Sequence, residues 1–352
     1  MKKIACFISP HGFGHATRVI AVLEALKSIS PEFHSHLFTT APQGLFSSLD
    51  DYTLHHEPID IGVVQDSALT VDIPATIARL AEMLPYCPES LAELAARCAG
   101  CSFILCDIAP IAIAVGQRSG IPTVLLENFT WDWIYEPYCE RHPELRQHVK
   151  FLAELFPQAN YRIQTEPLCR EKNRDIVCGP IFRQIRMHQE EVRTRLQVAG
   201  RSLILITLGG IAQKLPELRR LEEQQDLFFV IAGQPHTEQV TDNCLLLQRD
   251  ADVSHPDLIG AADLVVCKAG YSTIAECRQA GARVVVIDRD YPESRILQDF
   301  VKKVLGGVLV SPALYERGEW LPFARELLRR RQPAPAAENG ADKAADFLAG
   351  LL

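Results

Sequence analysis

Two histidines and two glycines near the start of the chain are the residues best suited to chemistry. A short apolar run, beginning at Ile4, ends in His11, Gly12, Gly14 and His15. Glycines let the backbone turn tightly, and the amides at the start of a following helix favour an anionic or polar guest. Histidine is well suited to proton transfer near neutral pH. The pattern therefore indicates a binding or catalytic loop, with His15 as the base and His11 as its competitor.

Other interpretations of this loop remain open. A dinucleotide-binding loop would read Gly-x-Gly-x-x-Gly, but Thr17 stands at the third glycine position, where a side chain hinders packing of helix on strand. A purely structural loop with a hydrogen-bonded histidine is the second alternative. Arg18 either neutralises a bound phosphate or pairs with a neighbouring carboxylate.

The elements that must position this loop alternate between strands and helices along both halves of the chain. Strands are predicted at 3–9, 34–39, 103–107, 122–126, 161–164, 203–207, 227–232, 244–247, 264–267, 283–287 and 308–310. Helices are predicted at 17–29, 74–98, 109–118, 190–198, 214–222, 271–280, 294–304 and 342–350. This alternation is typical of parallel sheets covered by helices on both faces.

The break between the halves falls near Gly179, after a polar stretch without apolar periodicity. We expect an N-terminal domain at 1–178, on which 342–352 can pack back, and a C-terminal domain at 182–331. The predicted fold class is α/β, with two doubly wound, Rossmann-like domains that face a cleft. Ligands in such sheets bind beyond the carboxyl ends of the strands.

Composition excludes several classes of protein. The 352 residues are 47% hydrophobic and 23% charged, and the net charge of −8 argues against a nucleic-acid partner. Apolar runs stay shorter than the ~18 residues that span a bilayer, and the N-terminal run stops too early for a secretory signal. We therefore expect a cytoplasmic protein. The eleven cysteines indicate reduced thiols, and the single Cys-x-x-Cys pair, Cys98 and Cys101, is a weak basis for zinc.

Three apolar runs in the second half end in glycines: Gly209 with Gly210, Gly233, and Gly270. Exposed amides at such turns can bind a diphosphate. Beside the last of them, Lys268 is either a cation for that diphosphate or a surface lysine. Ser272 or Thr273 is predicted to cap the following helix.

Glu276 lies one turn into the same predicted helix. It can accept hydrogen bonds from two vicinal ribose hydroxyls, or simply interact with the helix dipole.

The stretch from Lys268 to Tyr291 resembles the nucleotide-sugar half of GT-B glycosyltransferases. The nearer relatives are the UDP-glycosyltransferases and the bacterial enzyme that adds N-acetylglucosamine to a lipid-linked peptidoglycan precursor. The resemblance implies that Glu276 is the donor-binding glutamate and that 11–18 is the histidine-bearing loop. It also implies that 1–178 is the acceptor-side domain and 182–331 the nucleotide-sugar-binding domain. A sharper match, which includes residues 128–135, is to the glycosyltransferase-like amino-terminal region of plant arabinokinases, with its very similar His-Gly-Phe-Gly-His-Ala-Thr-Arg segment.

Two departures from these families matter. No glycine- and serine-rich ATP loop follows residue 310, so the resemblance does not extend to the kinase half of the arabinokinases. The carboxylate–glutamine pair that grips the donor sugar is not evident either, and Glu293 is its nearest equivalent. The identity of the donor sugar therefore stays open.

On the acceptor side, Asp107 ends an apolar run. The resemblance implies that this carboxylate orients the catalytic histidine, although it could also cap the helix that begins near Pro110. Trp131, Asp132 and Trp133 form an aromatic cluster in a chain with only 7% aromatic residues. They are interpreted as a wall for the acceptor, with a packed loop core as the alternative.

Together these features predict a metal-independent, inverting glycosyltransferase that moves a sugar from a nucleoside-diphosphate sugar, a UDP-sugar in particular, to an acceptor hydroxyl without any further cofactor. His15 is the predicted base and Asp107 its partner. The predicted acceptor-binding residues are His11, Gly14, Arg18, Trp131, Asp132 and Trp133. The expected partners are the donor and a small-molecule or glycan acceptor, with no nucleic acid, and the oligomeric state stays open.

Three alternatives to a transferase with a soluble acceptor remain. They are a non-catalytic sugar-nucleotide sensor, a GT-B nucleotide-sugar epimerase, and a peripheral membrane transferase with a lipid-linked acceptor. The last would need a basic amphipathic surface, for which the sequence shows no strong helix.

Overall fold

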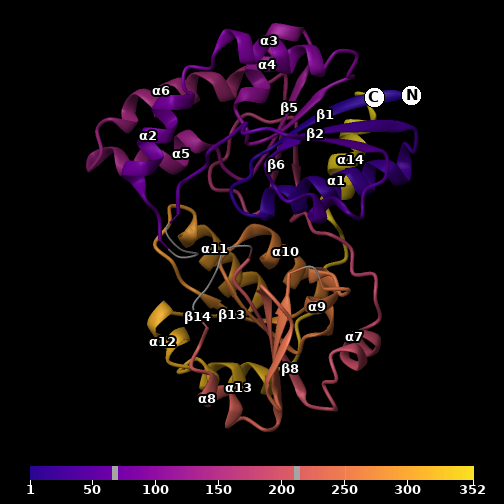
Figure 1. Cartoon of the computed structure of the whole chain (residues 1–352), viewed down its shortest axis with the longest axis vertical. Helices are drawn as coiled ribbons and strands as arrows, with labels where there is room; N and C mark the ends of the chain where they lie inside the picture. The colour runs from indigo at the N-terminus through magenta and orange to yellow at the C-terminus, as the bar shows by residue number, and fades with distance from the viewer. Residues whose placement is uncertain (66–69, 210–214, 250) are drawn as a thin grey trace. The chain divides into compact units, whose positions relative to one another are not determined.

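The computed structural model describes residues 1–65, 70–209, 215–249 and 251–352 (Figure 1). The chain divides into two compact units. Among the described residues, the N-terminal unit comprises 1–65, 71–181 and 338–352, and the C-terminal unit comprises 70, 182–209, 215–249 and 251–337.

The N-terminal unit is built on a seven-stranded sheet in the order β3-β2-β1-β4-β5-β6-β7, with every neighbouring pair parallel. Its strands are β1 (Lys2–Ile8), β2 (Phe33–Thr39), β3 (Tyr52–His56), β4 (Ile104–Asp107), β5 (Thr123–Glu127), β6 (Tyr161–Thr165) and β7 (Ile176–Cys178). All four residues of β4 and all five of β5 are buried, as expected for a parallel sheet covered on both faces.

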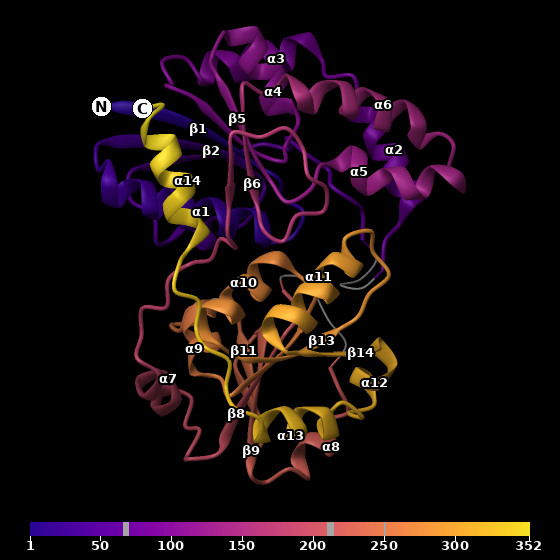
Figure 2. The same ribbon diagram turned by 180° about the vertical axis from the view of Figure 1, so that it is seen from behind.

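The helices of this unit are α1 (Gly14–Ile29), α2 (Ile73–Met83), α3 (Pro88–Arg97), α4 (Ile111–Ser119), α5 (Trp131–Tyr135), α6 (Leu145–Leu155) and α14 (Gly340–Ala349), with short 3-10 turns at Gln43–Phe46, Glu136–Glu140 and Phe156–Gln158. The C-terminal helix α14 lies beside α1 in both views (Figures 1 and 2) and shares one apolar core with it and with the sheet. The end of the chain thus completes the N-terminal unit.

One predicted helix was wrong in its extent. Residues 74–98 form two helices, because α2 ends at Met83 and α3 begins at Pro88. Pro85 lies between them, and proline both lacks an amide hydrogen and keeps the preceding residue out of the helical conformation.

The C-terminal unit has a second seven-stranded sheet, in the order β10-β11-β9-β8-β12-β13-β14. Its strands are β8 (Ser202–Thr207), β9 (Leu227–Gln234), β10 (Glu238–Thr241), β11 (Cys244–Gln248), β12 (Leu264–Lys268), β13 (Arg283–Ile287) and β14 (Val308–Val310). The pairing of β10 with β11 is antiparallel and the others are parallel. Because β10 only adds an edge, the other six strands repeat the order of β3 to β6 in the first unit, which has β7 as one further strand.

Helices cover both faces of this second sheet. They are α7 (Gln189–Arg195), α8 (Leu218–Glu222), α9 (His255–Ala261), α10 (Tyr271–Ala280), α11 (Ser294–Phe300) with a π turn at Val301–Leu305, α12 (Pro312–Glu316) and α13 (Leu321–Arg329). One apolar core joins the sheet to α7, α9, α10 and α11, and another joins it to α8, α12 and α13. The prediction of two doubly wound, Rossmann-like domains is confirmed.

In each unit the first strand lies inside the sheet, and the chain extends from it in both directions. The second strand of the unit lies on one side of β1 or β8, and β4 or β12 lies on the other. The loops after β1 and β4, and those after β8 and β12, therefore leave the sheet side by side at a topological switch point, where such folds bind ligands.

Candidate active site

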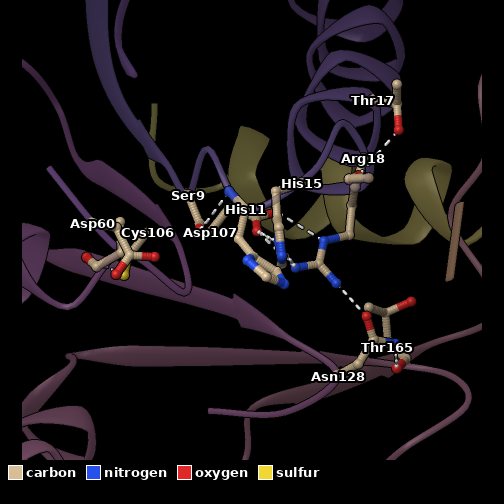
Figure 3. A network of polar contacts seen from close by, with 12 residues as sticks. Ser9, His11, His15, Thr17, Arg18, Asp60, Cys106, Asp107, Asn128 and Thr165 are labelled. Atoms are coloured by element: carbon tan, nitrogen blue, oxygen red, sulfur yellow. Dashed lines mark hydrogen bonds and ion pairs between the residues drawn. The ribbon is translucent and has the colours of Figure 1, made fainter. Parts of the chain in front are cut away.

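The N-terminal switch point brings His15 and Asp107 together. His15 is the second residue of α1, Asp107 is the last residue of β4, and β4 pairs directly with β1. The Nδ1 atom of His15 lies 2.7 Å from Oδ1 of Asp107 (Figure 3). Because an ionised carboxylate only accepts hydrogen bonds, Nδ1 carries the proton, and the lone pair of the neutral ring lies on Nε2.

Arg18 binds the same carboxylate. Its Nε donates to Oδ2 of Asp107 and its terminal NH2 to Oδ1, each at 2.7 Å. Burial alone would raise the pKa of Asp107, but the charges and hydrogen bonds of Arg18 and His15 hold it below its usual value. Of the two roles that the sequence left open for Arg18, the structure shows the ion pair with a carboxylate.

The backbone is strained directly after Asp107. Ile108 has a φ of 44°, in the left-handed region that β-branched residues avoid, and its side chain is buried. The Ser9 amide donates to the Asp107 carbonyl at 3.2 Å, which holds the ends of β1 and β4 together. Strain of this kind costs of order 1–3 kcal/mol and is found where surrounding packing enforces it, often at functional sites.

His11 has a different protonation pattern. Its Nδ1 accepts from the Val63 amide at 3.3 Å, so in the neutral ring the proton is on Nε2. Gly62 makes this placement possible, since it has a φ of +63° and a Cβ there would lie 2.6 Å from the His11 ring. The His11 ring meets the Trp131 ring edge-on, with 5.3 Å between centroids.

Trp131 lies inside the packed N-terminal unit, with 1% of its surface exposed. Its ring centroid is 6.4 Å from that of His15, and its Nε1 donates to Oδ2 of Asp60 at 2.9 Å. Asp132 and Trp133 are half-buried, and Asp132 Oδ1 has no hydrogen-bond partner among the described residues. The aromatic cluster thus combines a packed interior residue, Trp131, with two more accessible neighbours.

Asp60 is a site residue that the sequence reasoning missed. Burial raises its pKa to about 6, despite hydrogen bonds from Ser9 and Trp131. The available signal was a single carboxylate inside the apolar segment from Ile59 to Val64.

The C-terminal switch point carries the glycines that the sequence singled out. Gly209 follows β8 with a φ of +77°, and a Cβ there would lie 3.4 Å from the side chain of Lys268, the last residue of β12. A Cβ at Gly233 would lie 3.4 Å from the Gly209 carbonyl. Burial and the charge of Arg289 lower the pKa of Lys268 to about 8. Gly210 lies outside the described residues.

Helix α10 begins directly after this point. Its N-cap is Gly270, and Ser272 and Thr273 lie within its first turn. The prediction that one of these two hydroxyl residues is the cap is therefore wrong. Gly270 has no side chain and so makes no side-chain hydrogen bond to the first turn of the helix.

Glu276 lies in α10, 1% exposed, with both carboxylate oxygens engaged. Oε1 accepts from Arg183 Nε at 2.9 Å, and Oε2 accepts from His255 Nδ1 at 2.7 Å. Burial opposes ionisation, but the charges and hydrogen bonds of Arg183 and His255 hold the pKa of Glu276 below its usual value. The sequence reasoning missed both partners, because nothing local to Arg183 or His255 links them to α10.

Glu293 precedes α11 and is 3% exposed. Its Oε1 accepts from Arg289 at 2.7 Å, whereas Oε2 of Glu293 and Nε of Arg289 have no hydrogen-bond partner among the described residues. Burial raises the pKa of Glu293. A buried acceptor and a buried donor that the described chain leaves unpaired are suited to a polar ligand.

Two further observations concern only the part of the chain that the structure describes. No cluster of three or more His, Cys, Asp or Glu side chains there is arranged to hold a metal ion. No helix there has the length and apolar character needed to cross a membrane.

Comparison with known proteins agrees with this architecture. Residues 211–308 match the model of the glycosyltransferase family 28 C-terminal domain. The L-arabinokinase of Arabidopsis thaliana is 27% identical over 360 residues, which cover 98% of this chain and 34% of that protein. The chain thus spans about a third of the length of this relative.

Among solved structures, the calicheamicin glycosyltransferase CalG4 has a TM-score of 0.65 at 16% identity, with 100% of this chain and 98% of that chain covered. UGT89C1 of Arabidopsis thaliana, solved with UDP, has a TM-score of 0.66 at 11% identity, with coverage of 99% and 98%. The chain is therefore glycosyltransferase-like with a GT-B fold, and it is similar in sequence to an arabinokinase. The predicted resemblance is confirmed.

Proposed function

We propose that this chain transfers a sugar from a UDP-sugar to an acceptor hydroxyl by single displacement, with inversion and without a metal ion. The GT-B fold and the family 28 match support a nucleotide-sugar glycosyltransferase in general. The observation that carries the finer proposal is the 2.7 Å hydrogen bond between His15 Nδ1 and Asp107 at the N-terminal switch point.

The chemistry follows from that hydrogen bond. The lone pair on His15 Nε2 takes the proton from the acceptor hydroxyl as its oxygen forms a bond to the anomeric carbon. The bond from that carbon to the diphosphate breaks, and its electron pair leaves with the diphosphate. Asp107 stabilises the imidazolium that forms. General-base help of this kind contributes roughly 10²–10⁴-fold to the rate.

The same geometry favours His15 over His11 as the base. In the neutral ring of His11, the Nδ1 lone pair accepts from the Val63 amide and Nε2 carries the proton. A ring in that tautomer offers a donor at Nε2, which suits binding of an acceptor oxygen rather than removal of its proton. We assign His11, with Gly14, Trp131, Asp132 and Trp133, to the acceptor side.

The donor is assigned to the C-terminal unit. The amides around Gly209, Gly233 and Gly270, with Ser272 and Thr273, would bind the diphosphate together with Lys268. Glu276 would accept from the ribose hydroxyls through the remaining lone pairs of its oxygens, and Glu293 Oε2 would accept from a hydroxyl of the sugar. Stabilisation of the departing diphosphate by such preorganised groups is the larger contribution to catalysis.

Donor binding is the first test. Thermal shift and calorimetry with UDP, GDP, dTDP and ADP, followed by their sugars, are expected to show UDP as the strongest binder. The UDP-sugar is then incubated with acceptor pools, and release of UDP is measured with and without a metal chelator. If no nucleotide binds at millimolar concentration, the proposal is wrong. Release that stops on chelation would contradict metal independence.

A non-catalytic sugar-nucleotide module is the second candidate, because the chain matches only about a third of an arabinokinase. Such a module would bind the nucleotide sugar without turning it over. Binding of UDP-sugar by the wild-type chain, with no UDP release from any acceptor pool, would favour this candidate.

A further inference from the structure

Arg18 and His15 approach Asp107 from the same side of α1. They are three residues apart, so their side chains share one face of the helix, and Figure 3 shows both pointing at the carboxylate. Arg18 is only 6% exposed, and its NH1 donates to the side chain of Asn128. Asn128 in turn donates to the Thr165 carbonyl. All three nitrogens of the guanidinium therefore have protein partners, Asp107 for Nε and NH2 and Asn128 for NH1.

The electrostatic consequence differs from that of an isolated histidine–aspartate pair. In such a pair the full negative charge of the carboxylate favours the imidazolium. Here Oδ1 of Asp107 accepts from both His15 Nδ1 and Arg18, each at 2.7 Å, and the Arg18 nitrogen is 3.3 Å from His15 Nδ1. The guanidinium therefore offsets the charge of the carboxylate and places a positive charge beside the ring.

The other charged or titratable groups near His15 come from two loops. Asp60, which follows β3, has an electrostatic interaction with His15. His11, in the loop after β1, and His15 both pack against Trp131.

We infer that Arg18 is a positioning residue whose charge opposes protonation of the His15 imidazole and which holds Asp107 in the orientation that directs His15 Nε2 at the acceptor. The catalytic meaning of this inference rests on the proposed function, since a general base must be unprotonated before the reaction. The competing explanation is that Arg18 merely neutralises a buried carboxylate and supports the fold.

The test follows the protonation of His15 directly, in the full chain labelled for NMR at the histidine rings, between pH 5 and 9. Arg18→Gln and Arg18→Met remove the charge, and Arg18→Lys is the matched control that retains it. The uncharged variants are expected to raise the midpoint of the His15 titration by about one pH unit or more. The lysine variant is expected to stay closer to the wild type.

Activity provides a second readout. With a higher midpoint, kcat/KM of the uncharged variants falls more steeply than that of the wild type as the pH is lowered from 8 to 6, because less of the base is unprotonated. A loss of thermal stability with an unmoved midpoint would reduce Arg18 to a structural role and overturn the inference.

Asn128→Ala carries the test if neither uncharged variant folds. The guanidinium then keeps its two hydrogen bonds to Asp107 but loses the one from NH1 that fixes its place beside the His15 ring. The midpoint is expected to rise by a smaller amount, and an unchanged midpoint overturns the inference. Because the titration needs no substrate, a failure to detect sugar transfer would contradict the proposed function without deciding the role of Arg18. Normal sugar transfer together with an unchanged midpoint of the His15 titration would contradict only the role inferred for Arg18.

Discussion

The two switch points have the same arrangement of strands but differ in how their polar groups are paired. At the N-terminal one, both oxygens of Asp107 and the side chain of Arg18 are engaged within the protein. At the C-terminal one, both oxygens of Glu276 are also engaged, but Oε2 of Glu293 and Nε of Arg289 have no partner among the described residues, and Lys268 is partly desolvated.

This difference indicates that the repeated fold serves two roles, to hold a base in one unit and to bind a ligand in the other. A closed network of hydrogen bonds fixes the tautomer and orientation of a base before any substrate binds, which is what general-base catalysis requires. Glycine turns and incompletely paired polar groups instead suit a site whose hydrogen bonds are completed by a ligand. Four experiments can break or sharpen this comparison.

The largest expected effect is on turnover. His15→Ala should lower kcat by roughly 10²–10⁴-fold and leave UDP affinity within about twofold, because the donor groups lie in the other unit. Its matched control is His11→Ala, for which we expect a loss below about tenfold. Rates of UDP release and calorimetric affinities measure the two effects. Turnover that survives His15→Ala within threefold would mean that the N-terminal network does not supply the base.

The second prediction concerns Asp60, whose carboxylate is buried and therefore costly to ionise. Its folded-state pKa of about 6 exceeds the ordinary value of 3.8, so the folded state binds the proton more tightly than the unfolded state. Stability should therefore fall as the pH rises from about 4 to 6, by up to about 3 kcal/mol. Asp60→Asn removes this cost and keeps an acceptor for Trp131.

Urea unfolding at two pH values measures this effect. Asp60→Asn should be more stable than the wild type at pH 7.5 and equal to it at pH 4. Asp50→Asn, at an exposed position of the same unit, is the control and should change neither value. A variant that is less stable than the wild type at pH 7.5 would show that the ionised carboxylate contributes favourably.

Glu276→Gln tests the donor side. Loss of the charged acceptor should weaken UDP binding about tenfold to a hundredfold, while the titration of His15 in the other unit stays unchanged. Glu222→Gln, at an exposed position of the same unit, should leave the affinity unchanged. Calorimetry measures the UDP affinity of each variant, and circular dichroism checks that the variant is folded like the wild type. Unaltered UDP affinity in Glu276→Gln would contradict the proposal that Glu276 accepts hydrogen bonds from the ribose hydroxyls.

The smallest effect is a proton taken up on binding. With a pKa of about 8, Lys268 is half protonated at pH 8, and a bound diphosphate should raise that pKa. We expect uptake of about half a proton per UDP, measured by calorimetry in buffers of different ionisation enthalpy. Lys268→Met should abolish the uptake, whereas Lys150→Met, at an exposed position, should not. No uptake in the wild type would place the diphosphate away from Lys268.

Most of the fold could be predicted because its strongest signals are local. Helix α10 was predicted at 271–280 and is observed with those bounds, since Gly270 precedes it and Gly281, with a φ of +61°, ends it. Strand β13 was likewise predicted with its observed bounds. The short strands β3, β7 and β10 were missed, because three to five residues carry too little periodicity to identify a strand. The helices α6 and α9 were not predicted either.

The sequence by itself determined the alternation of strands and helices, and with it the two switch points and the residues that reach them. Only the tertiary structure decided how those residues pair. Arg18 and Asp107 are 89 positions apart in the sequence, and Arg183 and Glu276 are 93 apart. His11 accepts its hydrogen bond from Val63, which is 52 positions away. Periodicity, caps and turns act over a few residues, whereas the protonation of a buried group depends on charges that folding brings within about 4–6 Å. The tautomers of the two histidines and the partners of the two buried carboxylates therefore follow from the packed strands and loops, not from the local sequence.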